Sequence, residues 1–235
     1  MALFLSHRGE SDDAPENTLA AFALAMERDS DGLELDIRLT SDGFAVVVHD
    51  ADLKRVAGVD AVVSETSLEQ LQKLHDVPLL EEVLKLLRPG KHLQIELKGS
   101  DLGIVPALKK ILDNWPGDRK QLAISSFEEE TIQKAGEFFP DLPRVLLTDL
   151  SARFGCFPTA AETARYMRSL NCTGVSFKAD FAADKAFVEA LKAENMRVVC
   201  WGVFSDELGL AMAEAGVDAM TCNHAVALRE KFRSC

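Results

Sequence analysis

The stretch that decides the fold spans residues 32–50 and reads GLELDIRLTSDGFAVVVHD. Apolar residues recur on both sides of Asp42-Gly43, a dipeptide typical of tight hairpin turns. We therefore predict two antiparallel strands, 32–39 and 44–49, because a parallel pair would need a crossover of a dozen or more residues. The return arm of such a hairpin does not count among the parallel strands of a larger sheet.

Outward from this hairpin, short apolar runs alternate with longer amphipathic segments. This alternation implies parallel strands joined by crossover helices. Without the return arm eight parallel strands remain, which predicts an α/β fold of the TIM type, a (β/α)8 barrel with a β-hairpin arm after strand 2. An open doubly wound sheet is the alternative, but no glycine-rich phosphate loop opens the first helix. The predicted strands are 2–7, 32–39, 44–49, 93–98, 121–126, 144–148, 173–178, 197–202 and 217–222, and the predicted helices are 17–28, 67–74, 79–88, 101–113, 128–138, 159–169, 182–193 and 205–214.

The bulk composition suits one barrel domain over residues 1–235, since 47% of the residues are hydrophobic and 27% charged. The longest non-repeating segment, 50–66, is predicted to form a loop over the barrel mouth. The net charge of −12 argues against a nucleic-acid partner and requires a local positive cluster for any anionic substrate. Five cysteines without CxxC spacing, no secretory signal and no membrane-spanning run predict a cytoplasmic protein with reduced thiols.

Three carboxylates are predicted to meet at the barrel mouth. Glu34 and Asp36 share one face of their strand because side chains alternate, and Glu96 takes a similar place on the next barrel strand. Oxygen ligands without histidine or thiolate suit Mg²⁺ or Ca²⁺ better than zinc. The alternatives are surface alternation or a structural salt bridge to Arg38 or Lys98.

Two histidines and two fixed cations accompany these carboxylates. His7 and Arg8 end the first strand, His49 ends the hairpin arm, and Lys98 ends the third barrel strand. A two-residue hairpin turn would place Asp36 opposite His49, whereas a bulged turn would shift this pairing by one residue. Arg8 and Lys98 supply the charge that a phosphate needs. Two histidines suit a reaction with one base and one acid near neutral pH.

Aromatic side chains also follow the strands. Trp201 ends the seventh barrel strand and Phe127 follows the fourth. Each is either a core aromatic or an apolar wall beside a bound phosphate. Asp50 either orients His49 or caps the next turn. Taken singly, each polar candidate has a structural explanation, but their gathering at adjacent strand ends favours a functional site.

Segments spread over nearly the whole chain resemble the motifs of the glycerophosphodiester phosphodiesterase family. They are His7-Arg8-Gly9 with Ala14-Pro15-Glu16-Asn17-Thr18, Glu34-Leu35-Asp36 with Asp42-Gly43 and Val48-His49-Asp50, Leu79-Leu80-Glu81-Glu82-Val83 with Ile95-Glu96-Leu97-Lys98, and Trp201-Gly202-Val203 with Gly216-Val217-Asp218-Ala219. The first two groups are specific, and the last is weak alone. The resemblance implies a TIM-type barrel that hydrolyses a small-molecule glycerophosphodiester to sn-glycerol 3-phosphate and an alcohol.

The resemblance also implies roles for individual residues. These are a divalent cation on Glu34, Asp36 and Glu96, an acid–base pair of His7 and His49, and phosphate contacts from Arg8 and Lys98. Asn17 is expected to cap the first helix, and Glu16 to be structural.

The chain departs from the family pattern at two places near its end. Phe204 stands where a polar residue often follows the tryptophan motif, and Thr221-Cys222-Asn223 stands where an aspartate is common. Neither departure is expected to affect the residues proposed for the chemistry.

Two rival functions remain. A phospholipid headgroup hydrolase or cyclising lyase of the same superfamily would want an apolar rim, which is not visible in the sequence. A phosphate-binding barrel without activity would lack a ligand or a histidine, whereas this set is complete.

Overall fold

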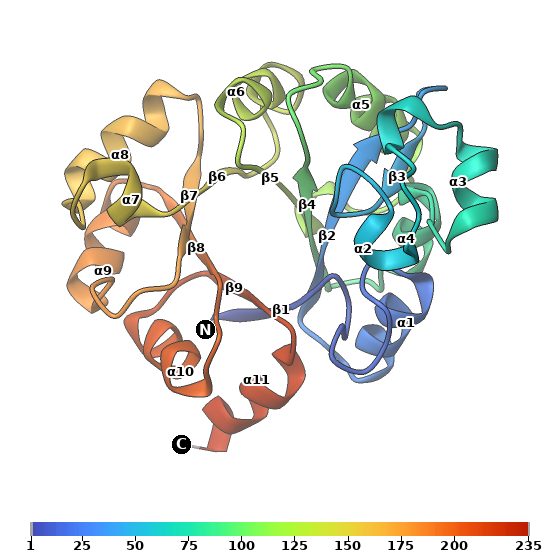
Figure 1. Ribbon diagram of the computed structural model, residues 1–235. Helices are drawn as coiled ribbons and strands as arrows, with labels where there is room; N and C mark the ends of the chain where they lie inside the picture. The colour runs from blue at the N-terminus through green and yellow to red at the C-terminus, as the bar shows by residue number, and fades with distance from the viewer. Residues whose placement is uncertain (1, 235) are drawn as a thin grey trace.

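Nine strands form one sheet, of which eight close into a parallel barrel (Figure 1). The computed structural model describes residues 2–234. The strands are β1 (Leu3–His7), β2 (Gly32–Leu39), β3 (Ala45–Val47), β4 (His92–Leu97), β5 (Leu122–Ser126), β6 (Arg144–Thr148), β7 (Gly174–Lys178), β8 (Arg197–Trp201) and β9 (Ala219–Cys222). Around the barrel the order is β1-β2-β4-β5-β6-β7-β8-β9, and β9 pairs back with β1. The predicted TIM-type barrel is confirmed.

Helices surround the barrel on the outside (Figure 1). They are α1 (Leu19–Glu27), α2 (Lys54–Ala57), α3 (Leu68–Leu74), α4 (Leu80–Leu86), α5 (Ile104–Asn114), α6 (Glu129–Phe138), α7 (Leu150–Phe154), α8 (Ala160–Ser169), α9 (Lys185–Ala193), α10 (Asp206–Ala215) and α11 (Ala225–Ser234), with short 3-10 turns η1 (Val63–Glu65) and η2 (Arg119–Gln121). Each predicted helix is present, and α2, α7 and α11 are additional. Apolar side chains between strands and helices form the main core.

The pairing of the hairpin arm with β2 is shifted by one residue from the pairing that a two-residue turn would give. The Val48 amide donates to the Asp36 carbonyl at 3.0 Å, so Asp36 lies opposite Val48. The predicted pairing of Asp36 with His49 is therefore wrong. The turn has three residues instead of two, and Gly43 has a φ of +84°, a conformation that suits glycine. This is the bulged turn that the sequence allowed as an alternative.

The segment over residues 50–66 is not an irregular loop, because it contains α2 and η1. Together with the arm and α3 it encloses a small apolar cluster separate from the main core. The buried members are Val46, Val48, Leu53, Val63, Leu71 and Val77. Burial of these side chains holds the segment beside β2 and β3.

Two sequence expectations concern the whole chain. Four cysteines in the described part are free thiols, namely Cys156, Cys172, Cys200 and Cys222, and the fifth, Cys235, lies outside the described residues. Among residues 2–234, no helix combines the length and the apolar character needed to cross a bilayer.

Candidate active site

A cavity of about 500 Å³ opens at the carboxyl ends of the barrel strands. In a TIM-type barrel this end carries the ligand-binding loops. Asp36 lies fully buried directly beside Glu96 on the neighbouring strand. All the other candidate residues line the cavity, namely His7, Arg8, Glu34, His49, Glu96, Lys98 and Trp201. Residues separated by almost 200 positions in the sequence are thus brought together.

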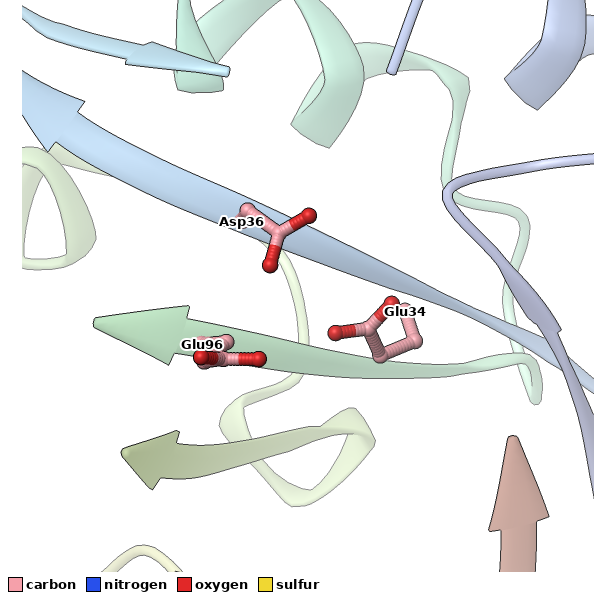
Figure 2. Close-up of side chains that lie close together, drawn as sticks. All are labelled: Glu34, Asp36 and Glu96. Atoms are coloured by element: carbon pink, nitrogen blue, oxygen red, sulfur yellow. The ribbon is translucent and has the colours of Figure 1, made fainter. Parts of the chain in front are cut away.

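Three carboxylates point toward one another from two adjacent strands (Figure 2). Glu34 and Asp36 come from β2, and Glu96 comes from β4. One oxygen of each lies within 4.8 Å of the others, and all three side chains are buried. The β2–β4 register explains this, because it pairs Asp36 with Glu96 while the two-residue period keeps Glu34 on the same face.

Burial and mutual repulsion change the pKa values of these carboxylates. Burial and the charge of Asp36 raise the pKa of Glu34 well above its ordinary value. The same causes, in the same order, raise the pKa of Glu96 to about 7. Burial would raise the pKa of Asp36 as well, but Lys98 and Arg8 hold that pKa below its usual range. Without a further cation, the ionised forms of Glu34 and Glu96 are therefore disfavoured in this cluster at neutral pH.

The donor set fits a divalent cation. Three buried oxygens accept no hydrogen bond of normal geometry, namely Glu34 Oε2, Asp36 Oδ1 and Glu96 Oε1. Lys98 Nζ makes the alternative salt bridge, at 3.1 Å from Asp36 Oδ1 and 2.5 Å from Glu96 Oε1. Lys98 and Arg8 together supply two positive charges against three carboxylates, and an all-oxygen donor set is the kind that hard cations prefer. These three residues could hold such an ion.

The turn after β1 aims Arg8 at this cluster. Arg8 has a φ of +58°, which residues other than glycine rarely adopt, and its amide donates to the Glu34 carbonyl at 2.9 Å. Gly9 follows at +83°, where an added Cβ would lie 2.6 Å from the backbone of Ala21. The Arg8 Nε then lies 3.1 Å from Asp36 Oδ2. Backbone strain of this kind is often found at functional sites.

Both histidines are held through Nδ1. The His7 Nδ1 lies 2.8 Å from Asn223 Oδ1, and the His49 Nδ1 lies 2.7 Å from Asp50 Oδ1. Because both partners are acceptors, each Nδ1 carries a proton and each Nε2 is left for the cavity. Burial lowers the pKa of both imidazoles. Of the two readings of Asp50, orientation of His49 is the one that the structure supports.

Two expectations about neighbouring residues are wrong. Asn17 does not cap α1, because Thr18 is the N-cap and its hydroxyl accepts from the Ala21 amide. The Asn17 side chain instead donates to Asp36 Oδ2 at 2.9 Å. Asn223 does touch the site, through His7. Its position one residue beyond the last barrel strand was a usable signal, since barrel closure sets that strand beside the first.

Arg55, which the sequence analysis passed over, connects the two histidine-bearing segments. Its Nη1 and Nη2 donate to the two carboxylate oxygens of Glu16, each at 2.7 Å, and its Nε donates to Asp50 Oδ2 at 2.6 Å. Glu16 in turn accepts from Arg8 at 2.9 Å, and Asp50 contacts His49. Glu16 therefore lies between two arginines, and its expected structural role stays a prediction. One guanidinium on α2 links a site arginine to a site histidine.

The opposite side of the cavity is aromatic. Trp201 and Phe127 pack edge to face, with ring centroids 5.2 Å apart, and the Trp201 Nε1 is buried without a hydrogen-bond partner. Lys98 Nζ lies 5.5 Å from the centroid of the Phe127 ring. Of the two readings of Trp201 and Phe127, the apolar wall is the one that the geometry supports.

Comparison with known proteins gives consistent matches over the whole barrel. The model of the glycerophosphoryl diester phosphodiesterase family matches residues 7–227. A glycerophosphodiester phosphodiesterase of Caldanaerobacter subterraneus is 29% identical, covering 93% of this chain and 92% of its own. Another, from Bacillus altitudinis, is 28% identical and covers 99% of this chain and 100% of its own.

A solved structure shares the fold. It is an Oleispira antarctica phosphodiesterase in complex with the product sn-glycerol-3-phosphate. The two chains superpose with a TM-score of 0.82 at 24% identity, over 99% of this chain and 97% of that one. The agreement in fold extends from the first strand to the last helix.

Proposed function

Because the chain belongs to the glycerophosphoryl diester phosphodiesterase family, we propose that it hydrolyses glycerophosphodiesters to sn-glycerol 3-phosphate and an alcohol. The observation that supports this most is the buried trio of carboxylates facing two oriented histidines in one cavity. The Oleispira relative holds the same product, sn-glycerol-3-phosphate. An acid–base reaction on a phosphate beside a cation needs this combination of groups.

We propose that Glu34, Asp36 and Glu96 would hold a Mg²⁺ or Ca²⁺ ion, which when bound would supply positive charge at the phosphate. Arg8 and Lys98 add fixed positive charge beside the same position. Both are tied to Asp36, so their charges stay in place while the negative charge on the phosphate develops. Trp201 lines the apolar side of the bound substrate. This local positive charge offsets the repulsion of an anionic substrate that is expected from a chain of net charge −12.

The two histidines divide the proton transfers. One takes a proton from the nucleophile, which is water or the neighbouring glycerol hydroxyl, and the other protonates the departing alkoxide. Each acts through Nε2, because Asn223 and Asp50 occupy the Nδ1 atoms of His7 and His49. We further propose that the enzyme is a cytoplasmic protein of one domain, 1–235, with no nucleic-acid partner.

The proposed reaction is tested by the release of glycerol 3-phosphate from glycerophosphocholine and glycerophosphoethanolamine. We expect release in Mg²⁺ or Ca²⁺, loss of release in EDTA, and recovery when the ion is added back. Circular dichroism and a cooperative thermal melt establish that the protein is folded. Folded protein that releases no product with any ion would rule out this function and favour the lipid hydrolase or the binding barrel.

Replacing Arg55 with alanine should lower kcat by about 10- to 100-fold, the usual effect of losing a residue that positions a site group. The reason is that Arg55 acts through Asp50 and Glu16 and touches no reacting atom, so KM should change much less than kcat. Added guanidinium chloride, at a concentration too low to unfold the protein, should restore part of kcat by occupying the gap between the two carboxylates.

Arg119→Ala is the matched control for this variant. Arg119 also binds one carboxylate through two nitrogens, Nε at 2.7 Å and Nη2 at 3.1 Å from Asp141, but far from the cavity. It should keep wild-type kcat and show no response to guanidinium. A positioning role for Arg55 is excluded if Arg55→Ala keeps wild-type kcat, or if its loss of activity follows only a loss of folded protein.

A further inference from the structure

Three phenylalanines are exposed on the rim of the active-site mouth. The exposed fractions are 42% for Phe127, 60% for Phe181 and 81% for Phe204. Phe127 follows β5, Phe181 follows β7 and Phe204 follows β8, so all three lie beyond carboxyl ends of barrel strands. Carboxyl ends of parallel barrel strands share one end of the molecule, which is the end that bears the cavity. Of these three, only Phe127 was considered as part of the mouth on the sequence alone.

One half of the mouth carries the groups proposed for the chemistry, and the other carries the exposed phenylalanines together with an ion pair between Lys178 and Asp149, at 3.1 Å. The carboxylates, Arg8, Lys98 and both histidines come from β1, β2, β4 and the hairpin arm. Phe127 follows β5, the neighbour of β4, whereas Phe181 and Phe204 follow β7 and β8 on the other side of the barrel (Figure 1). One cavity nevertheless contacts both halves. It is lined by Glu34 and Glu96 on one side and by Phe127, Trp201 and Phe204 on the other. A ligand in this cavity can therefore touch charged and aromatic groups at once.

Two of these aromatic side chains pack against each other, and a third lies close by in the sequence. Phe127 meets Trp201 edge to face at 5.2 Å, and Phe204 lies over Gly202, where an added Cβ would come within 3.3 Å of its ring. Exposure of Phe204 does little for folding, because most of its ring stays in water. Exposed apolar side chains that line the same cavity as polar groups often mark a surface that a ligand covers, and Phe127, Trp201 and Phe204 all line this one.

We propose that Phe127, Trp201 and Phe204, with Phe181 farther along the same side, form an aromatic rim that binds an alkyl or acyl chain carried by the phosphodiester. This inference rests on the proposed function and names its substrate class, amphiphilic glycerophosphodiesters with a single chain. The reaction is unchanged. Overall, the oxygen of water bonds to phosphorus and gives up a proton to one histidine, the bond from phosphorus to the departing alcohol oxygen breaks, and that oxygen gains a proton from the other histidine.

A cationic headgroup is the other occupant that an aromatic surface could accept. The position of Lys98 argues against it. The Lys98 Nζ lies 5.5 Å from the centre of the Phe127 ring, so a quaternary ammonium on that ring would meet like charge. An uncharged chain meets no such repulsion, and the solvent-open rim sets no fixed limit on its length.

The test measures kcat/KM over two series of substrates kept below their micelle concentrations. One carries the chain on the glycerol, from glycerophosphocholine to 1-acyl lysophosphatidylcholines, and the other carries it on the alcohol, from glycerophosphomethanol to glycerophosphooctanol. We expect kcat/KM to rise by about tenfold or more over six added methylenes in one series, since each buried methylene favours binding. The series that responds shows which side carries the chain.

Variants of the rim residues test whether the preference for longer chains depends on the aromatic rim. Phe127→Ser and Phe204→Ser, singly and together, should reduce the ratio of long-chain to short-chain kcat/KM about tenfold when combined. Phe44→Ser is the control, because Phe44 is similarly exposed, at 44%, but lines a separate groove beside α5. It should leave the ratio unchanged.

Several results would overturn the inference. They are a flat profile in both series, a chain preference that survives the double variant, or a preference for choline over an uncharged alcohol of equal size. A flat profile together with rim-dependent sedimentation on phosphatidylcholine vesicles would instead assign the rim to membrane docking. If the wild type hydrolyses short and long substrates equally, only the rim inference fails. If it hydrolyses none, the proposed function fails as well.

Discussion

Replacing Glu34 with glutamine is expected to stop hydrolysis and, at the same time, to make the cation-free protein harder to unfold. The loss of activity should reach about 10³-fold, because charge supplied to a phosphate by a bound cation is worth several kcal/mol and each 1.4 kcal/mol is tenfold in rate. The gain in stability has a separate cause. Glutamine keeps the shape of the side chain but removes a buried carboxyl group whose ionisation is costly, because two other buried carboxylates lie within 4.8 Å.

The sign of the pH effect follows from the raised pKa values of Glu34 and Glu96. A carboxyl group whose pKa is higher in the folded state binds its proton more tightly there, so it favours folding at low pH. This contribution is complete below the ordinary pKa of 4.5 and is lost as the pH rises through the folded value, about 7 for Glu96. The melting temperature of cation-free wild-type protein should therefore fall relative to that of Glu34→Gln between pH 4.5 and pH 7 and above. The lowered imidazole pKa values of His7 and His49 act in both proteins and leave this difference unaffected.

Thermal melts in EDTA and in Mg²⁺ or Ca²⁺ check this prediction. At pH 7.5 without cation, Glu34→Gln should melt about 4–8 °C above the wild type, which corresponds to about 2 kcal/mol in a domain of this size. Added cation should raise the wild-type midpoint and leave the variant almost unchanged. The control Glu189→Gln changes an exposed glutamate and should behave as the wild type. A variant that melts below the wild type without cation would show that the carboxylates do not repel one another as proposed.

Replacing either His7 or His49 with alanine should lower kcat by about 10²- to 10⁴-fold, the range typical of a lost general acid or base. Neither histidine belongs to the carboxylate trio, so the cation should still raise the melting temperature of both variants. This separates lost proton transfer from a lost ion. His75→Ala, at the end of α3 and outside the cavity, is the control that should keep full activity.

A substrate with p-nitrophenol as the leaving group identifies the acid. This alcohol departs without a proton, so the variant that lacks the acid should recover most of its rate, while the variant that lacks the base should not. The two-histidine mechanism would be abandoned if both alanine variants kept wild-type turnover with glycerophosphocholine.

Much of the site could be predicted because it depends on local periods. The alternation in Leu33-Glu34-Leu35-Asp36 fixes which side chains share a face, whatever surrounds the strand. The Asp42-Gly43 turn separates the arm from the barrel strands and makes the strand count correct. These features need no knowledge of distant contacts.

The wrong or missed predictions for Asn17, Asn223 and Phe204 depend on contacts between residues far apart in the sequence. Both Asn17 and Thr18 are good N-cap residues, and the selection of Thr18 depends on a bond from the Asn17 amide to the Arg8 carbonyl, at 3.0 Å, that bends the chain before the helix. The contact between His7 and Asn223 spans 216 positions and exists only once the barrel closes. The direction of the Phe204 side chain likewise depends on the conformation of the loop after β8, because no helical or strand periodicity applies there.

The division of the mouth has an evolutionary consequence. The residues proposed for the chemistry all precede residue 99, except for Asn223 behind His7, whereas the aromatic rim lies entirely after residue 126. Mutation in the later half of the gene can therefore reshape which alcohols or chains are accepted while the earlier half keeps the ion and the proton transfers intact. Relatives that share the first half of this barrel and differ in the second are the expected products of such drift. Recombination between them at the start of β5 would exchange selectivity as a unit.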